Sequence, residues 1–109
     1  MVDAHSRDVA IQRAAAMFRT AGDVERLRIL ASLRDREARV MDLATALDAS
    51  VFAVARALAA LCAARLVVRR PRGALVVYSL ADSHVRALLD AVIEHASAGP
   101  GAECAAGDG

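Results

Sequence analysis

The chain has 109 residues, a length typical of one domain rather than two. It is 57% hydrophobic and 25% charged, which predicts a packed core and excludes a disordered chain. All 14 basic residues are arginines and they oppose 13 acidic residues, so the chain lacks the strong basic excess of a non-specific nucleic-acid binder.

Several further classes are excluded by what the sequence lacks. No apolar run reaches the roughly 20 residues that span a bilayer, and the first residues do not follow the pattern of a signal peptide. Cys62 and Cys104 alone do not make a disulfide framework, so we expect a protein of the reducing cytoplasm. The sequence holds no phosphate-binding loop, CxxC, HExxH or nucleophile–base pair, which argues against an enzyme.

Alanine, the strongest helix former, accounts for 27 residues and favours a mostly helical fold. Ser6 and Asp23 are the expected N-caps of the first two helices, because both side chains can accept a hydrogen bond from a free backbone amide. Leucines at every third position give the second helix its inner row. In chain order, the first three predicted helices cover residues 6–20, 24–34 and 40–47.

Ser50 is the expected N-cap of a fourth helix that runs to about residue 64. Its inner row is predicted to be Val51, Val54, Leu58 and Leu61. The pattern then changes to two period-two runs at 66–68 and 74–80. These predict a β-hairpin around an arginine-rich tip at residues 69–73.

Asp82 is the expected N-cap of a last helix that ends near residue 96. This helix carries two apolar lanes, one for its own core and one for a partner helix. The first lane is predicted to hold Val85, Leu88, Leu89, Val92 and Ala96. Residues 97–109 are rich in glycine and alanine, and we expect them to form a disordered tail.

This order of elements predicts a mainly α fold with one small β-hairpin. A short helix, a tight turn, a longer helix and a basic hairpin make up a winged helix–turn–helix domain, which we place at residues 1–96. The core is thin, since it has only three aromatic residues, and such a small domain often gains stability by pairing with itself. We therefore expect a homodimer formed largely by the first and last helices.

The second helix of the paired motif is expected to enter the major groove of double-stranded DNA. At 100° per residue its outer face carries mostly alanine, so only Arg56 and the cap residue Ser50 can hydrogen-bond a base or phosphate, and Phe52 can contact a thymine methyl group. The hairpin arginines are expected to contact phosphates. Two alternatives stay open: the helix only packs, and the hairpin tip is only a solvated turn. The full set of predicted DNA-binding residues is Ser50, Phe52, Arg56, Arg69, Arg70 and Arg72.

The last helix also carries a pattern of metal-binding side chains. His84 and His95 are 11 residues apart, so they lie on one line of the helix and about 16 Å from each other. One helix cannot bring both to one ion, but an antiparallel pair of these helices can, giving two equivalent sites. Asp82 can supply an oxygen beside His84. The alternative is that Asp82 is an ordinary N-cap and both histidines are polar interface residues.

The chain also resembles a known family. The stretch GDVERLRILASL resembles the "DPTRLRIL" signature of ArsR/SmtB metal-sensing repressors, and residues 41–96 resemble the rest of such a protein. The resemblance covers about residues 12–96. It implies a cytoplasmic homodimeric repressor that holds an operator until metal binds and then releases it.

The family pattern differs from this chain in the reading helix and in the metal sites. In the reading helix, Phe52 and Ala57 replace a serine and a histidine, so we expect weak base readout. In the last helix, Asp82, His84 and His95 match the family's ligands by type and spacing, whereas the fourth ligand position is Ala98, which cannot bind metal. Water, or a group from a terminus such as His5, Glu103 or Cys104, is left to fill that position.

A second family site, a Cys-x-Cys pair on the short helix, is replaced by Arg39 and Met41, which excludes arsenite or antimonite sensing there. One carboxylate and two imidazoles suit zinc first, and nickel or cobalt with further ligands. The sequence therefore predicts a transcriptional repressor whose operator affinity falls when zinc, nickel or cobalt binds between the last helices. Two alternatives remain: a family member that is redox-responsive or constitutive, and a dimerisation module that does not bind DNA.

Overall fold

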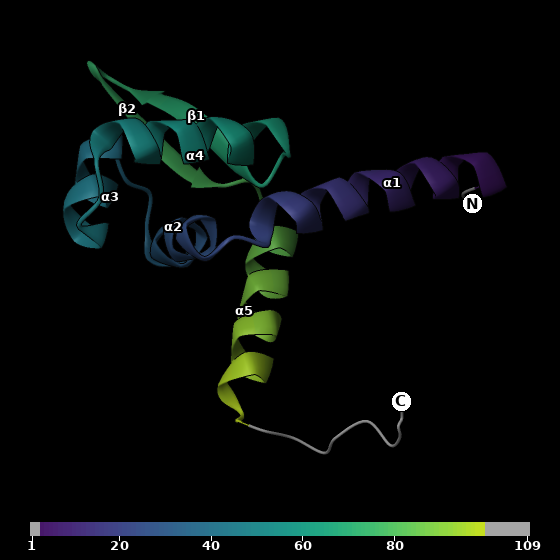
Figure 1. The fold of residues 1–109 in the computed structure, drawn as a ribbon. Coiled ribbons are helices and arrows are strands. Elements are labelled where there is room, and N and C mark those ends of the chain that lie inside the picture. The colour runs from purple at the N-terminus through teal and green to yellow at the C-terminus, as the bar shows by residue number, and fades with distance from the viewer. Residues whose placement is uncertain (1–2, 100–109) are drawn as a thin grey trace.

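The computed structural model describes residues 3–99 of the chain. A compact body is formed by three helices and a hairpin, while α1 projects from it as an arm and α5 leaves it in another direction (Figure 1). The predicted mainly α winged helix–turn–helix fold is confirmed. In chain order the elements are α1 (Ala4–Ala21), α2 (Val24–Asp35), α3 (Val40–Leu47), α4 (Val51–Ala63), β1 (Val67–Arg72), β2 (Leu75–Leu80) and α5 (Ser83–Ser97).

Most helices begin where a short polar side chain accepts a hydrogen bond from the first turn. Asp23, Ser50 and Asp82 each accept from the backbone amide three residues on, at 3.0 Å, as predicted. The predicted N-cap Ser6 is wrong. The Asp3 carboxylate accepts from the Ser6 amide at 2.7 Å, so α1 begins two residues earlier.

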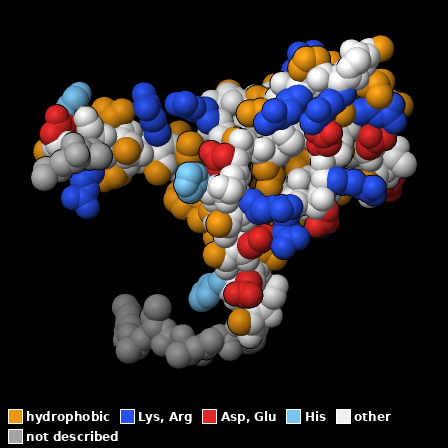
Figure 2. All heavy atoms as spheres, turned by 180° about the vertical axis from the view of Figure 1, so that it is seen from behind, with side chains coloured by type: hydrophobic (Ala, Val, Ile, Leu, Met, Phe, Trp, Pro, Cys, Tyr) orange, Lys and Arg blue, Asp and Glu red, His pale blue; other side chains and the backbone are white. Residues whose placement is uncertain are grey.

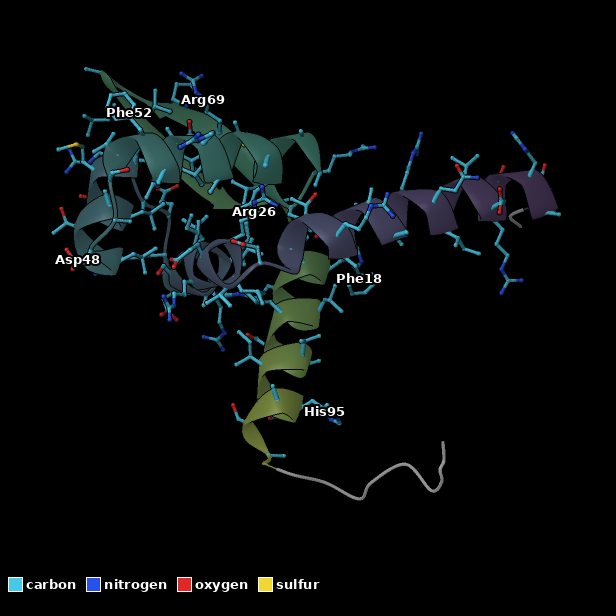
Figure 3. The ribbon with its side chains drawn as sticks, in the orientation of Figure 1. Phe18, Arg26, Asp48, Phe52, Arg69 and His95 are labelled. Carbon is cyan, nitrogen blue, oxygen red and sulfur yellow. The ribbon has the colours of Figure 1, made fainter. Side chains whose placement is uncertain are left out.

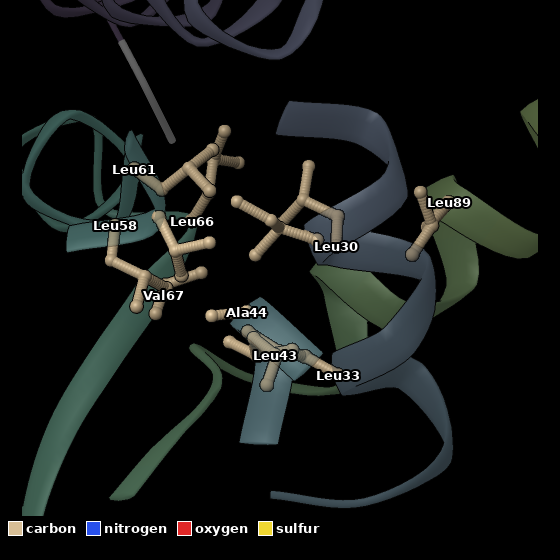
Figure 4. Packing of buried hydrophobic residues seen from close by; sticks show 11 residues of the cluster. Leu30, Leu33, Leu43, Ala44, Leu58, Leu61, Leu66, Val67 and Leu89 are labelled. Carbon is tan, nitrogen blue, oxygen red and sulfur yellow. The ribbon is translucent and has the colours of Figure 1, made fainter. Parts of the chain in front are cut away.

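The core lies where α2, α3, α4 and the base of the hairpin meet (Figure 4). Leu58 and Leu61 of α4 are fully buried, and Val54 is 2% exposed, as their spacing predicted. Val51 was predicted to face inward, yet it is 41% exposed because it stands in the first turn of α4, where the body no longer covers this row. The remaining buried side chains are Ile29, Leu30, Leu33, Leu43, Ala44, Leu66, Val67, Val77 and Leu89.

The hairpin is longer than predicted, because β1 continues through the arginines. Arg69 pairs with Tyr78 and Arg70 with Val77, so the predicted tip at 69–73 is wrong and the turn lies at residues 73–74, where Gly73 has a φ of 63°. Pro71 is tolerated there because β1 pairs with β2 on one side only. On the other side of β2, backbone bonds of 2.7 and 3.0 Å join Tyr78 to Ala38, which fixes the hairpin to the α2–α3 loop.

The two outer helices bury little of their surface in the single chain. α1 has no fully buried residue, and α5 buries only Leu89. Leu88 and Val92, predicted to face the chain's own core, are each 46% exposed, because α5 touches the body over only part of its length. The predicted tail at 97–109 lies mostly outside the described residues, and Ser97 belongs to α5. Within residues 3–99, no single helix is both long and apolar enough to cross a membrane.

We expect Leu58→Ala to lower the free energy of unfolding by about 2–5 kcal/mol, because it leaves a cavity at the centre of the core. Urea unfolding followed by circular dichroism measures the loss. Phe52→Ala, on the same helix but 83% exposed, serves as the control and should change stability by no more than about 0.5 kcal/mol. Equal effects of the two substitutions would contradict this assignment of the core.

Candidate functional site

α3 and α4 are arranged as a helix–turn–helix. The chain bends by 116° between them, within the range usual for this motif. The turn is closed by Asp48 in the left-handed conformation, with a φ of 51°, and by a 2.9 Å bond from the Ala49 amide to the Ala44 carbonyl oxygen. Because the inner row of α4 is held in the core, the opposite row is held outward.

The outer face of α4 carries the residues that the sequence singled out. Phe52 is 83% exposed, and Arg56 is exposed one turn further along. The Ser50 hydroxyl oxygen accepts from the Ala53 amide at 3.0 Å, which leaves the hydroxyl proton available as a donor. Phe52 and Arg69 lie on the same side of the molecule, above α4 and the hairpin (Figure 3).

The three hairpin arginines differ in how they are held. The Arg72 guanidinium lies 3.1 Å from a Glu37 carboxylate oxygen, and Arg70 Nε donates to the Ser79 hydroxyl at 3.2 Å. Arg69 is exposed, and no hydrogen bond or ion pair holds its side chain within the described residues. Blue side chains line the edge of the molecule over the hairpin in Figure 2. The structure therefore places these arginines along β1 rather than at the tip of the hairpin. Arg69 lies on the same side of the molecule as Phe52 of α4 (Figure 3).

Of the predicted metal ligands, His84 and His95 lie on α5, and Asp82 is its N-cap. His84 Nδ1 is 3.7 Å from Asp82 Oδ1, and the His84 side chain is 94% exposed. His95 is exposed three turns further along and projects on the side toward which α1 extends (Figure 3). Asp82 Oδ1 already accepts from the Val85 amide, so Asp82 can cap the helix with one oxygen and offer the other to an ion. Within residues 3–99 of one chain, no three histidine, cysteine or acidic side chains come together as a metal site.

An open apolar groove separates α1 from α5. It has a volume of about 250 Å³, and it is bordered by Met17 and Phe18 on α1 and by Leu88 and Val92 on α5. Phe18 is 59% exposed, which is unusual for so large an apolar side chain. The apolar lanes of the last helix indicated such a surface in the sequence, but not which residues of the first helix would face it.

Two further features were missed or left open by the sequence. Glu37, which anchors Arg72, was not among the predicted site residues, because its charge gives no sign of a partner 35 residues away. Cys62 lies half-buried in α4, and burial raises the pKa of its thiol more than the nearby Arg69 lowers it. A raised pKa disfavours the reactive thiolate. Cys104 lies outside the described residues.

The exposed face of α4 and the adjoining hairpin define a winged helix–turn–helix protein. Residues 23–68 match a family described as "Bacterial regulatory protein, arsR family". The HTH-type transcriptional regulator NmtR of Mycobacterium tuberculosis is 38% identical over 86 residues, which cover 79% of this chain and 72% of that protein. The chain therefore belongs to the arsR family of bacterial regulatory proteins.

Other relatives and solved structures agree with this assignment. The HTH-type transcriptional regulator KmtR of Mycobacterium tuberculosis is 42% identical over 86 residues, or 78% of this chain and 66% of that protein. A transcriptional repressor SmtB homologue of Synechocystis is 42% identical over 84 residues, or 77% of this chain and 64% of that protein. The chain thus spans just under two thirds of the length of these two relatives.

Among solved structures, a homodimeric winged helix–turn–helix DNA-binding domain from Mycobacterium bovis, a possible ArsR-family regulator, superimposes with a TM-score of 0.81. It is 25% identical and covers 87% of this chain and 88% of its own. Reduced HlyU from Vibrio cholerae gives a TM-score of 0.73 at 27% identity, over 82% of this chain and 94% of its own.

Proposed function

We propose that this chain is a transcriptional repressor that binds operator DNA as a homodimer and loses affinity for it when a divalent metal binds to α5. The observation that carries the proposal is the outward face of α4, which presents Phe52 and Arg56, with Arg69 of the hairpin on the same side of the molecule as Phe52 (Figure 3). An α-helix of this kind fits the major groove, and a flanking basic strand lies along the phosphates.

The chemistry of this face supports backbone contact more than base readout. The outer face of α4 is rich in alanine, and Arg56 is its one guanidinium, able to bind a guanine or a phosphate. Phe52 has the apolar surface to contact a thymine methyl group. Arg70 and Arg72 must leave Ser79 and Glu37 to reach a phosphate, whereas Arg69 gives up no such contact. We therefore expect DNA binding that is salt-sensitive and only moderately sequence-selective.

We expect Arg56→Ala and Arg69→Ala each to reduce the slope of log affinity against log salt concentration by about one unit per lost phosphate contact. Arg72→Ala should have a smaller effect, because its guanidinium already pairs with Glu37. Fluorescence anisotropy with DNA from upstream of the chain's own gene measures these slopes. Arg28→Ala, which removes an arginine paired with Glu25 on α2, is the control. Unchanged slopes in all three variants would show that DNA binds elsewhere.

The apolar groove between α1 and α5 supports the homodimer. Phe18, Leu88 and Val92, which line this groove, are each between 46% and 59% exposed in one chain, an apolar surface that water disfavours. A second copy related by a twofold axis would cover it with the same helices. The solved Mycobacterium bovis domain of the same fold is described as homodimeric.

We expect Val92→Glu to convert the dimer to monomer at micromolar concentration, because it buries a carboxylate in the apolar interface. Sedimentation velocity distinguishes the two species. Met41→Glu, at an apolar side chain on α3 that is 60% exposed and outside the groove, should leave the dimer intact. A parent chain that sediments only as monomer would contradict the proposed dimer.

The donors on α5 fit a divalent ion when two helices are paired. Asp82 and His84 of one chain and the partner's His95 would hold the ion, with two equivalent sites in the dimer. A carboxylate with two imidazoles and one water satisfies the tetrahedral shell of zinc, while nickel or cobalt needs further ligands. Bound metal supplies a cross-link between the two α5 helices, and Ala98 at the fourth family position makes us expect only moderate affinity.

We expect zinc to lower the affinity for DNA by about 5- to 150-fold, the usual range of allosteric coupling. His84→Ala and His95→Ala should each weaken zinc binding and abolish this release. Calorimetric zinc titration and anisotropy with and without zinc test both steps. Glu94→Ala, which changes an exposed α5 residue outside the proposed site, is the matched control. Parent-like zinc binding and release in both α5 variants would refute the site.

A further inference from the structure

The joint between α5 and the body is small and largely ionic. Among the described elements, α5 contacts α2 and β2 most closely, and its one buried apolar residue is Leu89, with Val85 half-buried beside it. One row of two side chains can hold a helix against a surface but fixes its angle poorly. The polar contacts next to Leu89 therefore help to fix the direction in which α5 leaves the body.

Those contacts converge on Arg34, in the last turn of α2. Its guanidinium bonds through Nε and Nη2 to the two carboxylate oxygens of Asp90 on α5, the second at 3.4 Å, and Nη1 lies 3.1 Å from Asp35 Oδ1. These two acids raise the pKa of Arg34 above its usual value. In return, the Arg86 guanidinium of α5 donates to the Arg34 carbonyl oxygen, one of the unpaired carbonyls at the end of α2. Arg34 is thus bonded to α5 through both its side chain and its backbone.

The Arg34–Asp90 contact lies on a different side of α5 from the proposed metal ligands. At 100° per residue, Asp90 stands roughly 120° from His84 and roughly 140° from His95 around the helix. Figure 2 agrees, since pale-blue histidines follow one edge of α5 and mixed blue and red side chains gather on the other. A metal cross-link would therefore act on one side of α5, while Arg34 holds the helix on another side.

The residues that follow Arg34 lead directly to the candidate DNA-binding surface. Glu37 pairs with Arg72 of β1 at 3.1 Å, and Ala38 exchanges two backbone bonds with Tyr78 of β2. Arg39 then opens α3, where the Asp42 carboxylate accepts from both its amide and its guanidinium. Six consecutive residues, 34–39, hence connect α5, the hairpin and the first helix of the helix–turn–helix.

We propose that Arg34 is the positioning residue through which α5 and the DNA-binding surface are coupled, acting by its paired bonds to Asp90. This inference rests on the proposed function, since it names the contact that transmits a change in α5. The contact contributes little to stability, because both side chains are well exposed, at 45% for Arg34 and 39% for Asp90. Its two-point geometry nevertheless defines an orientation, which a single contact does not. Removing it should loosen the angle of α5 and leave the fold intact.

The test compares Arg34→Ala and Asp90→Ala with the parent and with Arg28→Ala, which removes an arginine from a pair within α2. The readout is the ratio of DNA affinities without and with zinc, measured on the chain's own upstream DNA. We expect this ratio to fall at least fivefold in both variants, since about fivefold is the lower end of the usual allosteric effect on affinity. In Arg28→Ala the ratio should stay at the parent value. Arg34→Lys keeps the charge but loses the two-point contact, so its ratio should be intermediate.

The urea midpoints of all variants should equal that of the parent. A variant that is merely destabilised would lose DNA affinity equally with and without zinc, and its ratio would not change. The double variant Arg34→Ala with Asp90→Ala should have the ratio of the single variants, since both remove the same contact. Parent-like ratios in Arg34→Ala and Asp90→Ala would overturn the inference and leave the proposed repressor standing.

A second measurement needs neither DNA nor metal. Spin labels at Glu94→Cys on α5 and Ala46→Cys on α3, with Cys62 and Cys104 replaced by serine and labelled chain diluted in unlabelled chain, report the angle of α5 by their distance distribution. We expect a narrow distribution in the parent and in Arg28→Ala, and a broadened one in Arg34→Ala. An unchanged distribution in Arg34→Ala would overturn the inference. If the parent gives a narrow distance distribution but its DNA affinity does not change with zinc, the proposed function fails rather than the proposed role of Arg34.

Discussion

The burial of one row of α4 is the constraint on which the other features depend. Leu58 and Leu61 are completely enclosed, and the helices and strand around them are packed against this row. Because a helix cannot turn one side inward without turning the other outward, the same packing fixes the direction of Phe52 and Arg56. The orientation of the candidate DNA-binding surface is thus determined by hydrophobic burial rather than by contacts of its own.

The local signals in the sequence were sufficient for most of the fold. Asp23, Ser50 and Asp82 begin helices because their side chains bond to amides three residues away, a relation visible in the sequence itself. The extent of β1 was not visible, because Pro71 and Gly73 suggest a turn and only pairing with β2 shows that the strand continues. Asp3 was overlooked in favour of Ser6 for a similar reason, since both are good caps and the backbone decides between them.

In the candidate site, too, local features could be predicted from the sequence and long-range contacts could not. The histidines of α5 and the cap Asp82 follow from spacing on one helix, so their arrangement could be predicted. The contacts that join helices could not, since Arg34 and Asp90 are 56 residues apart and Glu37 and Arg72 are 35 apart. Charged residues between helices carry no mark of their partner, and only the fold brings them together. The apolar groove has the same origin, because it exists only once α1 and α5 have taken their directions.

The exposure of α1 makes its stability depend on the concentration of the protein. This helix buries no residue fully in its own chain, and its alanine-rich surface gains most from being covered by a second copy. By mass action, the ordering of such a segment then depends on concentration as well as on sequence. In the proposed dimer, dilution would uncover this arm, so its exposure to proteases would rise as the concentration of the protein falls.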